Sequence, residues 1–158
     1  MAILNIVKDG DEILRKRSRE IDVIDQRLLT LIEDMKETMD KAGGVGLAAV
    51  QVGKLKRLLV INTGEEEVTL INPKLLSFSG EKEELEGCLS CPGKWGYRKR
   101  PTKVRVETLT VDGKTKRISA EGLLAKAICH EMDHLDGKLF YDEDCRILTP
   151  EEMKEHGL

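Results

Sequence analysis

Apolar residues recur with helical spacing between residues 26 and 42. The residues that share one face of this segment are Leu28, Leu29, Ile32, Met35 and Met39. Asp25 stands where an N-cap residue belongs, and Gly43 stands where a left-handed residue commonly ends a helix. The pattern therefore predicts an amphipathic helix from about residue 26 to residue 42.

A second helical pattern runs from about Glu121 to Leu135 and ends at Asp136-Gly137. One edge of the predicted helix carries Leu124, Ile128, Glu131 and Leu135, and the next edge carries Leu123, Ala127, His130 and His134. The two histidines thus border an apolar stripe instead of a fully polar face. We expect them to lie in a buried site.

Short apolar runs predict strands at residues 58–61, 68–71, 75–79 and 84–88. We expect Asn72-Pro73 to close the second of these strands, because proline cannot donate to a strand ladder. Residues 104–109 alternate with period two and are joined to residues 115–118 through Asp112-Gly113, a hairpin turn signal. The expected fold class is α+β, with short, mostly antiparallel strands around two long helices.

Length and charge limit the kind of protein this chain encodes. Its 158 residues contain no repeat or linker, so we expect one domain. The net charge of -3 gives no basic field for nucleic acid or an anionic membrane, and no apolar run is long enough to span a bilayer. Residues 1–9 reach Asp9 too early for a signal peptide, so we expect a cytoplasmic protein.

The segment His130-Glu131-Met132-Asp133-His134 carries the clearest chemical signal. Residues four apart share a helix face, so the two imidazoles can point at one site with Glu131 beside them. Imidazoles suit zinc, iron, nickel or cobalt, and the carboxylate is placed to handle a proton of a metal-bound water. The alternative is a helix that carries two histidines by chance.

A catalytic site of this kind needs a third protein ligand. Candidates after the second histidine lie in a polar tail that we expect to be solvated, namely Glu143, Glu151, Glu152, Glu155 and His156. Upstream, Cys88 follows Gly87, which allows close backbone approach, and a thiolate is a strong ligand for a borderline metal. Cys88 is the better candidate; the alternative is an inert buried thiol.

Cys91 leaves two further interpretations open. With Cys88, His130 and His134 it would make a closed structural zinc site, but the two pairs are much farther apart than in a DNA-binding finger. Glu131 would also have no purpose in such a site. A redox Cys-x-x-Cys motif is the other interpretation, although no βαβ pattern surrounds it.

A glycine-rich stretch between Gly44 and Gln51 is the third candidate segment. It lacks the lysine of a P-loop and does not follow a strand, as a dinucleotide-binding loop does. Small residues let a backbone lie close to an extended ligand, and the carboxamide of Gln51 can donate a hydrogen bond to a developing oxyanion.

Together these segments resemble the three motifs of peptide deformylase, the family that removes the N-formyl group from newly made proteins. The matching segments are 44–51 (Gly-Val-Gly-Leu-Ala-Ala-Val-Gln), 86–90 (Glu-Gly-Cys-Leu-Ser) and 130–137 (His-Glu-Met-Asp-His-Leu-Asp-Gly). Every defining position matches in the family's order, and the likeness extends through Asn72-Pro73 and residues 122–125. The resemblance implies a single deformylase-like catalytic domain over residues 1–158, in the cytoplasm of a bacterium.

The resemblance also implies roles for individual residues. Cys88, His130 and His134 would bind the metal, usually Fe²⁺ in the family, with Zn²⁺, Ni²⁺ or Co²⁺ able to replace it. Glu131 would act as general base and then as general acid. The Gln51 side chain and the Leu89 backbone N–H would hold the oxyanion.

The implied substrate is an N-formylmethionyl nascent peptide that pairs like an added strand with the segments around Val45-Gly46 and Gly87. Its methionine side chain would enter an apolar pocket lined by Val45, Leu123, Ala127 and His130. Arg98 or Arg100 would steady the peptide further along, unless they are ordinary solvated arginines. We expect no membrane or nucleic-acid partner.

Three features depart from the family, and the first is Glu12, where many relatives have proline after Gly10-Asp11, a difference in turn stiffness and not in chemistry. Cys91 replaces an aliphatic residue; it is either a small apolar side chain, the interpretation the sequence favours, or a thiol that forms a disulfide with Cys88 and displaces the metal. The second alternative predicts unusual sensitivity to oxidation. Residues 151–158 are acidic, whereas some relatives carry a longer basic helix that docks on ribosomal RNA, so the tail does not support proximity to the ribosome.

Two rival functions are a metallopeptidase that cleaves internal amide bonds and a non-enzymatic zinc or peptide-binding module. The cysteine candidate and the lack of a convincing downstream ligand argue against the first. Glu131 and Gln51 argue against the second, because a binding module needs neither residue.

Overall fold

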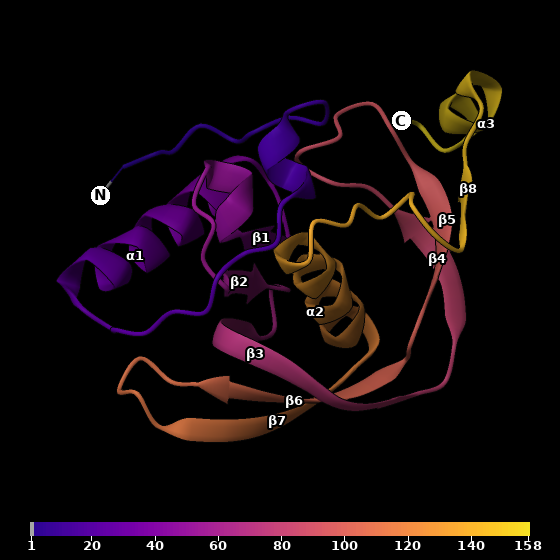
Figure 1. Ribbon diagram of the computed structural model, residues 1–158. Coiled ribbons are helices and arrows are strands. Elements are labelled where there is room, and N and C mark those ends of the chain that lie inside the picture. Colours follow the sequence, from indigo (N-terminus) through magenta and orange to yellow (C-terminus); the bar gives the residue numbers. More distant parts are fainter. Residues whose placement is uncertain (1) are drawn as a thin grey trace.

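A five-stranded and a three-stranded antiparallel sheet form the β structure of residues 2–158, which the computed structural model describes (Figure 1). In order across the larger sheet, the strands are β1 (Gly46–Ala48), β2 (Leu58–Asn62), β3 (Glu67–Ser79), β6 (Lys103–Leu109) and β7 (Thr115–Glu121). The smaller sheet contains β4 (Lys82–Glu86), β5 (Gly96–Arg100) and β8 (Cys145–Ile147). Helix α2 (Gly122–Leu135) lies between the two sheets. The fold class is α+β, as predicted.

Strand β2 separates the two hydrophobic clusters of the larger sheet. Successive side chains of a strand point to opposite faces. Accordingly, Leu58 and Val60 pack in the cluster formed with helix α1 (Gln26–Lys41), whereas Leu59 and Ile61 pack in the cluster formed with α2. This burial on both faces explains the continuous apolar run of the strand.

Helix α1 has the ends that the sequence predicts. The Asp25 carboxylate accepts a hydrogen bond from the Leu28 N–H at 3.0 Å, which satisfies one free donor of the first turn. Gly43 has a φ of 73° just beyond the helix. The buried face carries Leu28, Ile32, Met35 and Met39.

The prediction that Asn72-Pro73 closes a strand is wrong. Strand β3 continues through both residues to Ser79, and its pairing with β6 shifts register between Ile71 and Lys74. The shift leaves Pro73 outside the ladder, so its missing N–H breaks no pairing. The Asn72 side chain instead bonds the backbone N–H and C=O of Ile21, at 2.8 Å each.

The hairpin of β6 and β7 is confirmed, but the smaller sheet is largely missed. Strand β4 was expected at 84–88 and lies at Lys82–Glu86, so Cys88 stands in the loop that follows it. Strands β5 and β8 and the short helices η1 (Glu12–Arg15), η2 (Ala49–Val52) and α3 (Pro150–Glu155) were not predicted. None of the helices within residues 2–158 has the length and apolar character needed to cross a membrane.

The C-terminus of α2 is tied to the rest of the fold through Arg57. The Leu135 carbonyl accepts hydrogen bonds from the Ser18 N–H at 2.8 Å and from the Arg57 guanidinium at 3.1 Å. Arg57 also pairs with Asp136 at 3.1 Å. These contacts satisfy a free carbonyl of the last helical turn and fix the helix that carries both histidines.

Candidate active site

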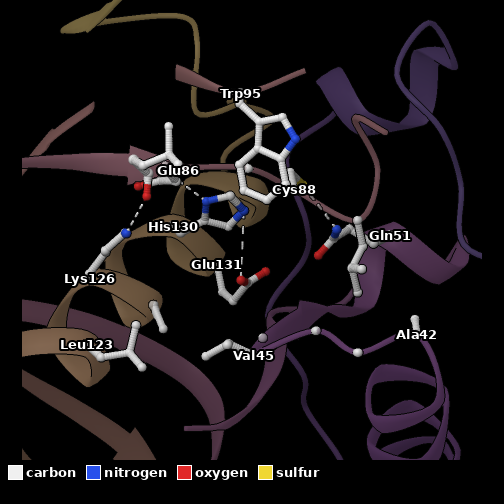
Figure 2. Close-up of a pocket in the computed structure, with 17 residues that line it drawn as sticks. Ala42, Val45, Gln51, Glu86, Cys88, Trp95, Leu123, Lys126, His130 and Glu131 are labelled. Carbon is white, nitrogen blue, oxygen red and sulfur yellow. Dashed lines mark hydrogen bonds and ion pairs between the residues drawn. The ribbon is translucent and has the colours of Figure 1, made fainter. Parts of the chain in front are cut away.

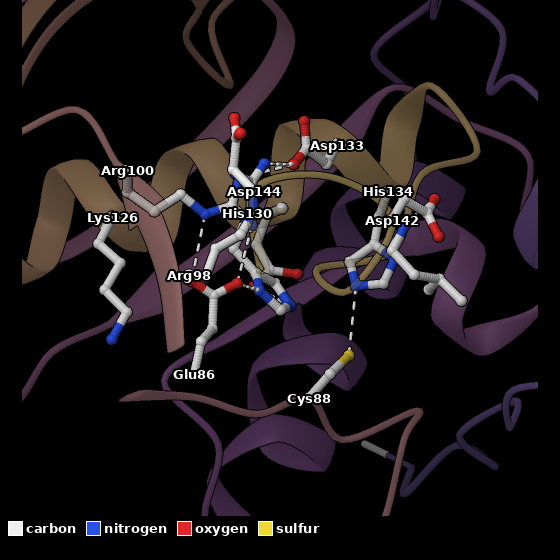
Figure 3. A network of polar contacts seen from close by, with 12 residues as sticks. Glu86, Cys88, Arg98, Arg100, Lys126, His130, Asp133, His134, Asp142 and Asp144 are labelled. Atoms are coloured by element: carbon white, nitrogen blue, oxygen red, sulfur yellow. Dashed lines mark hydrogen bonds and ion pairs between the residues drawn. The ribbon is translucent and has the colours of Figure 1, made fainter. Parts of the chain in front are cut away.

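Cys88, His130 and His134 bring three potential ligand atoms within 4.8 Å of one another. The histidines project from α2, and Cys88 lies in the loop after β4, with its sulfur 3.3 Å from His134 Nε2 (Figure 3). Ligands held at about 2.0–2.3 Å in a tetrahedron are separated by roughly 3.3–3.8 Å, so this donor set fits a zinc- or iron-sized ion. The site is built from two segments more than 40 residues apart in sequence.

The closed four-ligand zinc site is not formed within residues 2–158, since Cys91 is absent from the donor group. Its side chain packs against Leu139 and Phe140 instead. The candidate ligands of the tail, including Glu143, Glu151 and His156, are exposed, as expected. A site with three protein donors remains.

Glu86 fixes the orientation of the His130 ring. Its buried carboxylate accepts a hydrogen bond from His130 Nδ1 at 2.6 Å, which leaves Nε2 free to face the donor group. A metal-binding histidine usually donates its second N–H to such an acceptor. Burial raises the pKa of Glu86, but the hydrogen bonds from His130 and Arg100 outweigh it and lower the pKa to about 2.

The expectation that Arg98 or Arg100 faces the substrate is wrong. Arg100 is buried and binds both oxygens of Glu86, at 3.1 and 2.8 Å, and Asp133 at 2.6 Å (Figure 3). Arg98 lies 3.8 Å from Asp133, and neither arginine lines the cavity described below. The pair belongs to a charged network behind His130.

Glu131 is buried directly beside the donor group. Its Oε2 is 3.9 Å from His130 Nε2, and its Oε1 has no hydrogen-bond partner among the described residues. Burial raises the pKa of Glu131 to about 7. A Cβ at position 46 would stand 2.5 Å from Oε2, so any residue larger than glycine would have to displace this carboxylate. The carboxyl group can exchange a proton near neutral pH.

Gln51 presents its amide N–H groups toward Cys88. The side-chain Oε1 accepts from the Ala48 N–H at 2.9 Å, which sets the amide orientation. Nε2 then donates to Ser90 Oγ at 3.1 Å and lies 3.6 Å from the Cys88 sulfur. Because Gln51 is 1% exposed, its amide has little freedom to turn.

A cavity of about 440 Å³ opens onto these groups (Figure 2). Apart from the two arginines, the residues that the sequence placed near the substrate line it, namely Val45, Gly46, Gly87, Leu89, Leu123, Ala127 and His130. Val45 and Leu123 are 38% and 49% exposed, which places them at the open side of the cavity. The structure thus brings the predicted site residues together.

Trp95 and Lys126 are site residues that the sequence did not reveal, and Glu86 belonged to a matched motif but was given no role. A Cβ at Gly87 would lie 2.6 Å from the Trp95 ring, so the two residues form one wall of the cavity. Lys126 Nζ donates to the Leu85 carbonyl at 2.8 Å. Glu86 stands two residues before Cys88, and an acidic residue so close to a candidate ligand could have indicated its role beside the site.

Comparison with known proteins identifies the family. A profile of the polypeptide deformylase family matches residues 3–148. The chain belongs to this family. Its members are metal-dependent enzymes that remove the N-formyl group from the N-terminal methionine of newly synthesised proteins. The predicted enzyme class is therefore confirmed, and the metallopeptidase and zinc-module alternatives lose their support.

Related sequences and structures cover nearly the whole chain. The peptide deformylase of Acetivibrio thermocellus is 52% identical over 98% of this chain and 91% of its own length. Peptide deformylase 1 of Clostridium acetobutylicum is 57% identical over 90% of this chain and 95% of its own length. A Legionella pneumophila peptide deformylase structure has a TM-score of 0.87, with 44% identity over 97% of this chain and 90% of that chain. A Synechococcus elongatus structure in complex with actinonin also has a TM-score of 0.87, with 39% identity over 98% and 86%.

Proposed function

We propose that Cys88, His130 and His134 bind one divalent metal and that Glu131 transfers the proton during deformylation. The supporting observation is the convergence of the three donor atoms within 4.8 Å, beside a buried carboxyl group. The proposed physiological metal is Fe²⁺, with Zn²⁺, Ni²⁺ or Co²⁺ as substitutes. One thiolate and two imidazoles suit each of these ions. When bound, such an ion lowers the pKa of a coordinated water toward 7 and polarises the formyl carbonyl.

Glu131 acts first as general base and then as general acid in this proposal. Its pKa of about 7, caused by burial, suits a group that accepts and returns a proton at neutral pH. The proton accepted from water passes to the departing amine, which leaves formate and a free N-terminal methionine. Gly46 leaves the space that keeps Glu131 close to the reacting atoms.

Gln51 and Leu89 stabilise the oxyanion in this proposal. The Gln51 amide is fixed by Ala48 with its N–H groups directed toward the Cys88 side of the cavity. Leu89 lines the same cavity and would add its backbone N–H. Loss of one such donor typically lowers the rate by about 10²–10³.

The substrate lies between two free strand edges. Strand β1 is the edge of the larger sheet and β4 is the edge of the smaller one. Val45-Gly46 and Gly87, at the ends of these strands, line the cavity. An extended N-formylmethionyl peptide can add to these edges through main-chain hydrogen bonds, and its methionine side chain can pack against Leu123 and Ala127. Nascent chains supply this substrate in the bacterial cytoplasm, where we place the enzyme as a single catalytic domain.

Cobalt loading tests the metal ligands. Co²⁺-loaded protein should bind one ion per chain and show the charge-transfer absorption of a cobalt–thiolate bond. Cys88→Ser should lose that absorption and bind the ion more weakly. Cys129→Ser, on α2 but outside the donor group, is the matched control and should keep both properties. A Cys88→Ser protein with the parent's absorption and affinity would remove Cys88 from the metal site.

A further inference from the structure

Cys88 and Cys91 are the first and fourth residues of a tight turn. The Cys91 N–H donates to the Cys88 carbonyl at 3.0 Å. Residues in this relation have Cα atoms less than about 7 Å apart. A disulfide needs a Cα separation of about 4.4–6.8 Å, so the backbone of this turn can accept one. Both thiols are free in the structure.

The two side chains belong to one hydrophobic cluster but differ in access. Both pack with Leu139 and Phe140. Cys91 is 3% exposed, whereas Cys88 is partly exposed and lines the cavity. A small reactant that enters the cavity therefore meets the Cys88 sulfur, with the Cys91 thiol behind it.

We propose that Cys88 and Cys91 form a reversible oxidation site for hydroperoxides. In the first step the Cys88 sulfur attacks hydrogen peroxide, the O–O bond breaks, and Cys88 sulfenic acid and one water form. In the second step the Cys91 sulfur attacks the sulfenic sulfur, the S–O bond breaks, and the hydroxyl group leaves as water with the Cys91 proton. Two thiols lose two electrons to one peroxide, and one disulfide and two waters result.

The disulfide has two consequences. A disulfide sulfur is no longer a thiolate ligand, so the metal is released; this part alone rests on the proposed metal site. The disulfide also keeps Cys88 from the irreversible sulfinic and sulfonic acids. Cys91 then acts as a resolving cysteine, and a thiol reductant restores both groups.

Zinc-loaded protein gives the cleanest test, because zinc has no redox chemistry of its own. After treatment with two equivalents of hydrogen peroxide, enough to carry an unprotected thiol to the sulfinic acid, we expect a mass loss of about 2 Da, a Cys88–Cys91 cross-link in the peptide map, and release of zinc. Dithiothreitol and fresh zinc should restore the original mass and zinc content. Cys91→Val should instead gain about 32 Da at Cys88, and dithiothreitol should not reverse that gain.

Two further variants serve as controls for packing and for the choice of thiol. Cys91→Ser covers the case in which valine packs poorly, and it should behave as Cys91→Val does. Cys145→Ala removes another thiol packed against the same cluster and should leave the cross-link unchanged. The proposal is overturned if parent and Cys91→Val give the same oxidation products, if peroxide leaves Cys88 unmodified, or if Cys88 pairs with another cysteine. A Cys88–Cys91 cross-link without zinc release would instead count against Cys88 as a metal ligand.

Discussion

Replacement of Glu86 by glutamine removes the charge that His130 and Arg100 share. The carboxylate is 4% exposed and holds three hydrogen bonds, from His130 Nδ1 and from two nitrogens of Arg100. Glutamine has the same shape but no charge, and it can accept at one oxygen only. We therefore expect a less stable protein and a less firmly oriented His130.

The magnitude follows from the pKa of Glu86, which falls from 4.5 to about 2 on folding. A pKa difference of one corresponds to about 1.4 kcal/mol, so the carboxylate stabilises the fold by about 3 kcal/mol at pH 7. Because the folded-state pKa is depressed, this stabilisation is complete above pH 4.5 and disappears as the pH falls toward 2. At pH 3 about 1.4 kcal/mol remains. In Glu86→Gln, Asp133 still neutralises Arg100, so the loss of stability should lie at the lower end of the range of about 3–5 kcal/mol for a broken buried ion pair.

Urea unfolding of the metal-free proteins at pH 7 and pH 3 measures this effect. The free energy of unfolding of Glu86→Gln should lie about 3 kcal/mol below that of the parent at pH 7, and the gap should narrow by about 2 kcal/mol at pH 3. Metal affinity should fall by about 10–100-fold. Glu84→Gln, a half-exposed acid on the same strand, is the control and should change stability by less than about 0.5 kcal/mol. A gap below about 1 kcal/mol at pH 7, or one that does not change with pH, would refute the reasoning.

Three other perturbations probe the site and its support. Gly46→Ala should displace Glu131, because the new Cβ would lie 2.5 Å from its carboxylate. The kcat for formate release should then fall more than tenfold at unchanged metal content, and a parental kcat would contradict this close approach. Arg57→Met should cost about 2–4 kcal/mol in urea unfolding, since it removes one of the two hydrogen bonds to the last carbonyl of α2 and the ion pair with Asp136, whereas exposed Lys56→Met should cost little; equal costs would disprove the capping role. Chelation should lower Tm by an amount equivalent to about 2.7 kcal/mol when the parent is compared with protein at a free metal concentration of 100 times its Kd. The Tm of Cys88→Ser should change far less on chelation.

Periodic patterns in the sequence predict the elements that carry the chemistry. The spacing of apolar residues predicts α1 and α2, and the i, i+4 relation of His130 and His134 predicts that both histidines share one buried helix face. The hairpin of β6 and β7 follows from alternation and from Asp112-Gly113. These features depend on neighbours in sequence, so a single chain suffices to predict them.

Contacts between distant segments were not predictable in the same way. Strand β5 has the sequence Gly-Tyr-Arg-Lys-Arg and no apolar alternation, because its arginines are neutralised by Glu86, Asp133 and Asp144. Without the pairing of β4 with β5, Arg100 resembles a solvated side chain. The strand end predicted at Pro73 was wrong for a related reason, since the register shift that accommodates the proline depends on the partner strand.

Formate release from a formyl-Met tripeptide by nickel-loaded protein tests the central claim most directly. The comparison is between the parent and Glu131→Gln, with metal content measured in both. We predict fast release by the parent, and a loss of about 10²–10⁴-fold in Glu131→Gln at one metal ion per chain. Release by Glu131→Gln within a few-fold of the parent would contradict the role of Glu131, and no release by the fully loaded parent would contradict the proposed active site.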